Sequence, residues 1–81
     1  MLKELSTQKK LVGLKQSFKA VREGRAQKVY VARDADPKVL EPLLALCGEW
    51  KIPVEETPSM AQLGREAGIK IGASVVTLLK E

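Results

Sequence analysis

An unbroken apolar run, Val29–Ala32, constrains the fold of this 81-residue chain more than any other feature. A strand with one solvated face alternates apolar and polar residues, whereas a run without alternation is typical of a central strand covered on both faces. We expect this strand over Gln27–Arg33. Other parts of the chain must therefore form layers on both sides of the sheet.

The segment before this strand has helical periodicity. Leu14, Phe18 and Val21 recur at i, i+4 and i+7, which predicts a helix that packs through Phe18 and ends near Gly24. Upstream, residues 1–8 are compatible with a short helix and residues 10–13 with an extended segment.

A second helix is predicted after the strand. Asp36 can cap free backbone amides, and Pro37 suits the first helical position. An apolar stripe at i, i+3, i+4 and i+7 then predicts a core-facing helix that runs to about Trp50: Leu40, Leu43, Leu44 and Cys47. Cys47 is interpreted as a buried structural cysteine, because the chain has no histidine to activate it.

The C-terminal third repeats the strand and helix alternation. Residues 52–54 are predicted to be a strand, and Pro53 places it at a sheet edge or at a strand start. Ser59 and Gln62 have the spacing of a capping box for a helix through Ala67 that Gly68 ends. A closing strand is expected over 73–79. The alternation predicts an α/β fold, a three-layer α/β/α sandwich with a small mixed sheet.

Two large aliphatic side chains interrupt the turn before the last strand, at Ile69 and Ile71. One interpretation is that both tuck under the sheet as core residues. The other is that both are exposed together for contact with a ligand. The residues alone leave these alternatives open.

Composition excludes several classes of protein. With 44% hydrophobic and 30% charged residues, the chain is expected to form one globular domain over residues 1–81. No apolar run is long enough to cross a membrane, and residues 1–10 are too polar for a signal peptide, so we expect a cytoplasmic monomer without membrane contact. One cysteine and no histidine allow neither an intrachain disulfide nor a zinc site, and no cofactor is expected.

Charge is distributed unevenly along the chain. Residues 1–33 carry nine Lys and Arg against two Glu, a net of +7, whereas residues 34–81 carry five basic against eight acidic groups, a net of −3. A concentrated positive field attracts a polyanion, and phosphate chains are the common cellular example. The plain alternative is a solvated basic surface.

The basic residues of the first predicted helix have helical spacing. Lys15, Lys19 and Arg22 form a stripe beside the apolar one, and the helix start offers unpaired amides to a phosphate. Gln16 is the one side chain in this stripe that can both donate to and accept from a base edge. With 4% aromatic residues, stacking of successive single-stranded bases is not expected, so a folded RNA is the better target.

No pattern for catalysis is present. Asp34 and Asp36 could imitate a carboxylate pair, but Asp36 suits the role of helix cap and no acid or base partner lies nearby. We therefore expect no enzymatic activity.

Taken together, these motifs resemble the kink-turn-binding ribosomal protein family of the archaeal L7Ae type, in particular its small bacterial branch. The resemblance extends over nearly the whole chain. Its motifs are Gly13–Gln16 with Lys19, the strand 29–32 running into 33–37, Leu46–Cys47 ahead of Ile52–Pro53, Leu63–Gly64 with Ala67–Gly68, and the apolar turn before Val75.

The resemblance implies an α/β/α sandwich that binds kink-turn RNA, a sharply bent helix–internal loop–helix with tandem sheared G·A pairs, in ribosomal RNA or a riboswitch. The implied roles place the first helix start at the guanines and phosphates, Asp36 and Leu40 beside a flipped-out base, and the turn over bases at the bend. The implied contact residues are Gly13, Lys15, Gln16, Lys19, Asp36, Leu40, Ile69, Lys70, Ile71 and Gly72.

The chain departs from the family pattern at two places. Many archaeal and eukaryotic members have Asn-Glu where this chain has Lys15-Gln16, as the bacterial relatives tend to, and many members have a lysine where Met60 stands. Lys cannot accept a hydrogen bond from a guanine edge, and Gln accepts through one oxygen only. The alternative function is a protein-interaction subunit that uses the 69–72 turn without specific RNA recognition.

Overall fold

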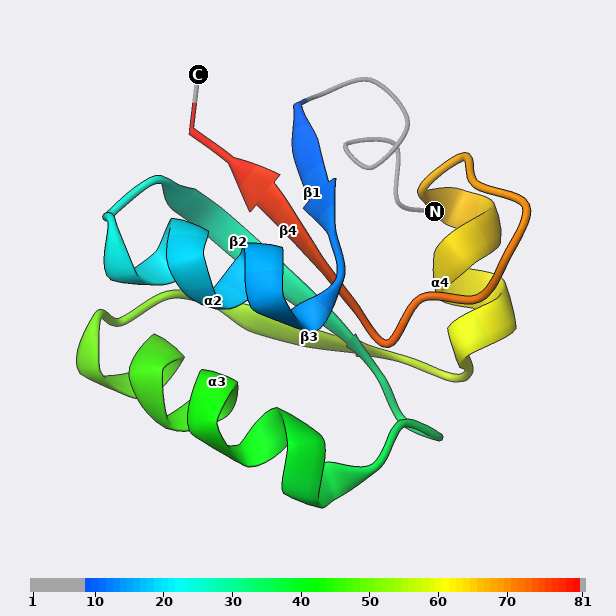
Figure 1. The fold of residues 1–81 in the computed structure, drawn as a ribbon, viewed down its shortest axis with the longest axis horizontal. Coiled ribbons are helices and arrows are strands. Elements are labelled where there is room, and N and C mark those ends of the chain that lie inside the picture. The colour runs from blue at the N-terminus through cyan, green and yellow to red at the C-terminus, as the bar shows by residue number, and fades with distance from the viewer. Residues whose placement is uncertain (1–8, 81) are drawn as a thin grey trace.

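The computed structural model describes residues 9–80, so the short helix considered for residues 1–8 lies outside the described part of the chain. Strands and helices alternate along it (Figure 1). In chain order the elements are β1 Lys10–Val12, α2 Leu14–Arg22, β2 Ala26–Ala32, α3 Pro37–Glu49, β3 Val54–Thr57, α4 Met60–Glu66 and β4 Val75–Leu79.

The four strands form one mixed sheet in the order β1-β4-β2-β3. β2 pairs in parallel with β3, with Val29 opposite Val54, and antiparallel with β4, with Val31 opposite Val75. β1 pairs antiparallel with the other side of β4. The position of β2 explains its composition, because a strand inside the sheet and covered on both faces has no solvated side.

Helices cover both faces of this sheet. α2 and α3 pack side by side on one face, with α2 against β4, and α4 packs on the other face against β2 and β3 (Figure 1). Val29 and Tyr30 of β2 are fully buried in the resulting core. The three-layer α/β/α sandwich expected from the sequence is confirmed.

The helices begin and end at the predicted signals. The Asp36 carboxylate accepts from the Lys38 amide at 2.9 Å, and the Ser59 hydroxyl accepts from the Gln62 amide at 3.1 Å. The side-chain nitrogen of Gln62 donates to Glu66 at 3.4 Å, one turn further along the helix. Gly24 follows the end of α2 in the left-handed region, at a φ of 73°.

Three details of the sequence interpretation are wrong. Leu44 is 38% exposed rather than part of the core, and Leu46 packs partly buried against the core in its place. The third strand starts at Val54, after Pro53, so the proline is not part of the strand. The other alternative, that this strand lies at an edge of the sheet, is confirmed. The last strand starts at Val75 rather than two residues earlier.

None of the helices within residues 9–80 has both the length and the apolar character needed to cross a bilayer.

Candidate functional site

The beginnings of all three described helices lie at one edge of the sheet. The Gly13 amide, just after β1, donates to the Val75 carbonyl at 2.9 Å, and the Ala32 amide at the end of β2 donates to the Ser74 carbonyl at 2.9 Å. The next amide, of Arg33, donates to Thr57 at the end of β3 at 2.8 Å. We call this the loop edge: residues 13–16, 33–36, 59–60 and 69–74.

The start of α2 is built to receive an anion. Gly13 precedes the helix at a φ of 110°, a conformation that L side chains rarely adopt, and no side chain caps the helix. No acidic residue occupies the first turn, and Lys15 and Gln16 are exposed there. Because the free amides and the helix dipole already make this end positive, a lysine is favourable here mainly when a negative group is bound.

The remaining cations of α2 extend from this start along the exposed side of the helix. Lys19 and Arg22 are both exposed, and a hollow in the surface runs beside them. It is lined by Leu14, Lys15, Gln16, Phe18, Lys19 and Arg22. The opposite side of the helix packs on the sheet through Ala20 and Val21, and also through Ser17, which the apolar periodicity did not identify because it is polar.

The turn before β4 is held tightly against α4. The Ile69 amide donates to the Gly64 carbonyl and the Ala73 amide donates to the Met60 carbonyl, each at 3.0 Å. Gly64 is buried, and a Cβ atom on it would run into the Ile71 carbonyl. The absence of a side chain at Gly64 is therefore what lets the turn lie directly on the helix.

This turn separates its two isoleucines. Ile69 packs partly buried against the core, whereas Ile71 is 75% exposed. Neither alternative considered from the sequence is right for both residues, since one tucks in and the other projects into solvent. Lys70 and Gly72, on either side of Ile71, are exposed as well.

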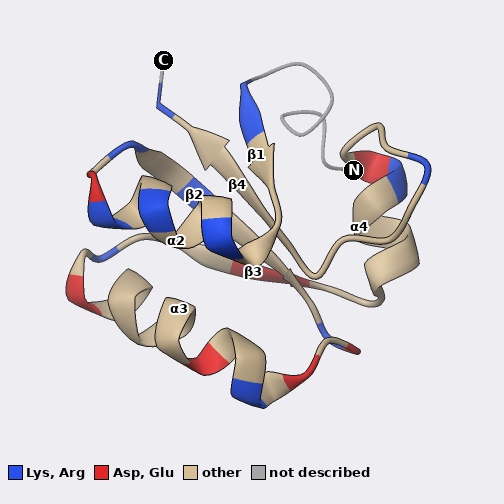
Figure 2. Ribbon diagram, viewed as in Figure 1, with Lys and Arg blue, Asp and Glu red and all other residues tan. Residues whose placement is uncertain are grey.

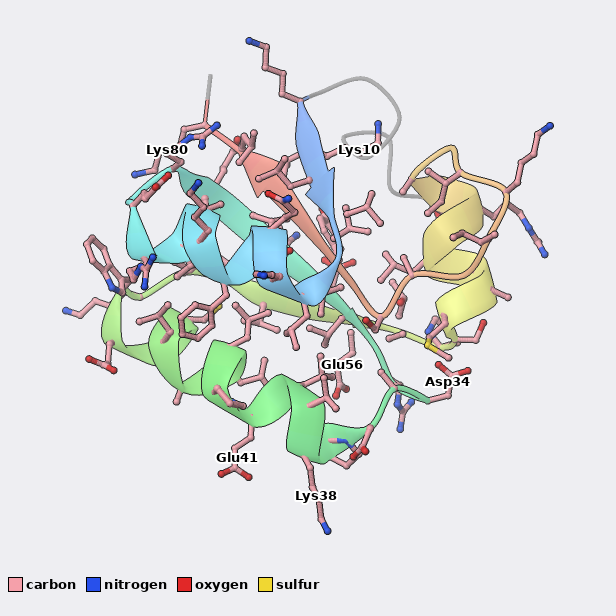
Figure 3. All side chains as sticks on the ribbon, viewed as in Figure 1. Lys10, Asp34, Lys38, Glu41, Glu56 and Lys80 are labelled. Carbon is pink, nitrogen blue, oxygen red and sulfur yellow. The ribbon has the colours of Figure 1, made fainter. Side chains whose placement is uncertain are left out.

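Asp34 has a role that sequence reasoning missed. Its carboxylate accepts from the Met60 amide at 2.8 Å and so ties the loop after β2 to the start of α4 (Figure 3). Because the Met60 carbonyl also holds Ala73, the loop, the helix and the turn form one connected unit. Asp34 and Asp36 thus each accept from a helix-start amide rather than forming a pair with each other. No local signal could find this contact, because it joins residues 26 positions apart.

Two other predicted residues are buried. Leu40 is 5% exposed and belongs to the core cluster, so little of its side chain is accessible to a ligand, whereas Asp36 beside it in the loop edge is exposed. Cys47 is 1% exposed, and burial raises the pKa of its thiol, which keeps it protonated and unreactive at neutral pH. The structural role expected for Cys47 agrees with this placement.

The ion pairs among the described residues do not involve the cations of α2, whose charge is therefore available to a ligand. Lys28 donates to Glu55 at 2.8 Å, a hydrogen bond that raises the Lys28 pKa, and Arg33 lies 4.0 Å from Glu56. Lys15, Lys19 and Arg22 form no ion pair with any residue between 9 and 80. Figure 2 shows basic segments over α2, the start of β1 and the C-terminal end, and acidic segments over α3, β3 and the loop before α3.

Comparison with known proteins identifies the family. The model of the ribosomal protein L7Ae/L30e/S12e/Gadd45 family matches residues 1–81. The chain belongs to this family. An RNA-binding protein of Geobacillus thermodenitrificans is 37% identical over 78 residues, which are 96% of this chain and 95% of the relative. RNA-binding protein YbxF of Geobacillus stearothermophilus is 38% identical with the same coverage.

Solved structures agree with this assignment. A protein of unknown function from Bacillus halodurans matches with a TM-score of 0.84 and 30% identity, over 95% of this chain and 77% of that one. The 15.5kD RNA binding protein of Giardia lamblia matches with a TM-score of 0.87 and 28% identity, over 96% of this chain and 66% of that one. The resemblance to the L7Ae family and the α/β fold, both predicted from the sequence, are confirmed.

Proposed function

We propose that this member of the L7Ae family is a non-catalytic RNA-binding protein that recognises kink-turns and stabilises their bent form. Family membership and relatives named as RNA-binding proteins support the RNA-binding part of the proposal. The target class is a kink-turn in ribosomal RNA or in a riboswitch. Binding to ribosomal RNA would make the protein a ribosomal or ribosome-associated component.

The start of α2 supplies the contacts to the G·A pairs in this proposal. The free amides after Gly13, together with Lys15 and Lys19, bind phosphates. Gln16 is exposed beside them and reads a guanine edge through its amide. Because Lys15 and Gln16 replace the Asn-Glu of many members, guanine recognition depends on the single Gln16 oxygen as acceptor.

The exposure of Ile71 is the observation that carries the kink-turn proposal. Ile71 is 75% exposed on a turn pinned by two backbone hydrogen bonds, and it belongs to the loop edge, as does the α2 start. We propose that Ile71, flanked by Lys70 and Gly72, covers bases that the bend unstacks. The carboxylate of Asp36 lies beside the flipped-out base, a contact to which the buried Leu40 adds little.

These two contact regions explain how binding would bend RNA. The α2 start and the 69–72 turn lie at the same end of the sheet. In this proposal, the bent RNA touches both regions at once, and the extended RNA touches only one of them. A ligand shifts an equilibrium by its differential affinity for the two states. The protein therefore stabilises the kink by binding the bent RNA better than the extended one.

A mobility-shift assay tests the proposal. It compares a kink-turn with an RNA of the same length and charge whose G·A pairs are replaced by Watson–Crick pairs. We expect the kink-turn to bind at least about tenfold more tightly, a free-energy difference of about 1.4 kcal/mol or more. Equal binding of the two RNAs would contradict kink-turn recognition and would favour a protein-interaction role for the 69–72 turn.

A further inference from the structure

A second group of cations lies at the end of the sheet opposite the loop edge. The Leu79 amide donates to the Lys9 carbonyl at 3.0 Å, and the Lys80 amide donates to the Arg25 carbonyl at 2.8 Å. These bonds bring together the residue before β1, the residue before β2 and the residue after β4. We call Lys9, Arg25 and Lys80 the far-end cluster; Figure 3 shows Lys80 at the opposite side of the molecule from Asp34.

The cluster is exposed and little neutralised. Lys9, Arg25 and Lys80 are all exposed. Arg25 has one acidic neighbour, Glu23 at 3.4 Å, and both of these side chains are about half exposed, so the pair is weak. Lys9 and Lys80 form no ion pair with residues 9–80. The positive charge of the cluster is therefore available to a ligand.

α2 links the cluster to the loop edge. Lys15 lies in its first turn at the loop edge, Lys19 and Arg22 lie in its last turn, and Arg25 follows after the turn at Gly24. The seven residues of β2 span the sheet between the two ends, a distance of about 20 Å at roughly 3.3 Å per strand residue. The cations thus follow one another from the loop edge to the far end, a track interrupted only at Glu23 (Figure 2).

We propose that the far-end cluster binds the phosphate backbone of an RNA stem that continues from the kink-turn, as a second contact independent of sequence. The inference rests on the proposed function. Flexible lysines without acidic partners suit phosphates, whereas base reading needs planar donor and acceptor groups. The acidic residues of α3, which packs beside α2 on the same face of the sheet, repel a polyanion and so favour a stem that follows α2 rather than α3.

The proposal predicts a dependence on stem length. A separation of about 20 Å corresponds to roughly six to eight base pairs, so a kink-turn with very short stems cannot reach the cluster. Lengthening one of the two stems by about eight base pairs should raise affinity, whereas the G·A pairs and the bend stay unchanged.

The test combines three RNAs with two variants. The RNAs are a short-stem kink-turn and two versions in which one or the other stem is lengthened. The variant Lys9→Gln with Lys80→Gln removes two cluster charges. The matched control, Lys38→Gln with Arg65→Gln, removes two exposed charges on α3 and α4, and Figure 3 shows Lys38 on the side of the molecule away from Lys80. Melting temperatures of both variants check that folding is unchanged.

Wild-type protein should bind one long-stem RNA more tightly than the short one, and the cluster variant should lose this advantage. Each phosphate contact contributes roughly three- to fourfold to the loss of affinity between 50 and 200 mM salt. The cluster variant should therefore show about tenfold less salt dependence than wild type on the long RNA and no change on the short one.

Two results would overturn the inference: no gain from either longer stem, or an equal loss in the control variant. The same assay includes the RNA whose G·A pairs are Watson–Crick. If that RNA binds as well as the kink-turn, the proposed function itself fails. If the kink-turn is preferred but stem length has no effect, only the far-end contact fails.

Discussion

At the scale of single residues, Lys15 lies at the positive end of a helix dipole, where its own positive charge is unfavourable. A positive charge in the first turn opposes the helix dipole by about 0.3–1 kcal/mol, and the first turn of α2 holds no acidic residue to offset it. Lys19 and Arg22, in the last turn, have the favourable arrangement. A phosphate bound at the start of α2 would make the position of Lys15 favourable.

Replacing Gln16 by Ala should reduce the preference for G·A pairs over Watson–Crick pairs. We expect a loss of about 1–3 kcal/mol, because Gln16 is the base-reading side chain of the proposal. Mobility shifts with the two matched RNAs measure this difference. Gln27→Ala, which alters an exposed glutamine at the start of β2, is the control and should leave the preference unchanged. An unaltered preference in the Gln16 variant would remove the reading role from this residue.

Lys19→Ala should weaken binding of every RNA by a similar factor. Its side chain is exposed and without an ion pair among the described residues, so it contributes as a phosphate contact. The slope of log affinity against log salt should become shallower by about one. Lys51→Ala, in the acidic half of the chain, should leave the slope as it is. A slope that stays the same in the Lys19 variant would argue against phosphate contact.

At the scale of elements, the loop edge is a connected unit rather than a set of independent loops. Asp34 holds the Met60 amide, the Met60 carbonyl holds Ala73, and Gly64 gives the turn room to lie on α4. The side chain that such a rigid turn presents can contribute to binding without a large ordering cost.

Ile71→Asp should abolish RNA bending with little effect on the fold. Because Ile71 is 75% exposed, we expect a change in unfolding free energy within about 0.5 kcal/mol. Fluorescence transfer between the two RNA stem ends reports bending, and thermal melting reports stability. Ile69→Asp is the matched control: it places a charge against the core and should lower the melting temperature markedly. A comparable drop for Ile71→Asp would show that Ile71 is a core residue.

Gly64→Ala should displace the turn. The added Cβ meets the Ile71 carbonyl, a backbone group that cannot rotate away, so the cost in stability should be about 1–3 kcal/mol and RNA bending should weaken. Urea unfolding and the same fluorescence assay measure both effects. Gly48→Ala, in α3, meets no atom within 4 Å and should be neutral or stabilising. Wild-type stability and bending in the Gly64 variant would contradict the close packing of the turn.

At the scale of the whole molecule, the buried thiol makes the stability of the core depend on pH. Burial raises the pKa of Cys47, so the folded state keeps the proton that the unfolded state releases from about pH 8.5 upward. The contribution is full below that pH and is lost as the pH rises toward the folded pKa, by at most about 1.4 kcal/mol per pH unit.

Urea unfolding at pH 7.5, 8.5 and 9.5 under reducing conditions should show this loss in wild type. Cys47→Ala should be less stable overall but should have a flatter pH dependence in the same range. The raised pKa of Lys28 does not interfere, because its contribution is lost only above about pH 10.4, the ordinary lysine value. Parallel pH curves for the two proteins would contradict the assigned cause.

The separation of basic and acidic residues is also a property of the whole molecule. One residue, Lys80, lies in a different region of the structure from the one suggested by its position in the sequence. Lys80 was counted with the net-acidic residues 34–81, yet the pairing of β4 places it beside Arg25 in the basic region. The linear count therefore predicted a basic region correctly but missed one of its members.

Sequence alone predicted the features that depend on neighbours a few positions apart. The caps Asp36 and Ser59 and the buried strand β2 follow from such short-range rules, as does the burial of Cys47. Of the apolar stripe predicted for α2, Val21 is buried, whereas Leu14 and Phe18 are only partly buried. Capping and periodicity involve one helical turn or one strand, so the residues that decide them are adjacent in the chain.

Only the tertiary structure decided the features that join distant segments. It exposes Leu44, separates the buried Ile69 from the exposed Ile71, and commits Asp34 to the start of α4. It also brings Lys80 to Arg25. Each depends on which surfaces meet after the layers pack, and that choice is made by contacts between residues far apart in the chain, which no local pattern contains.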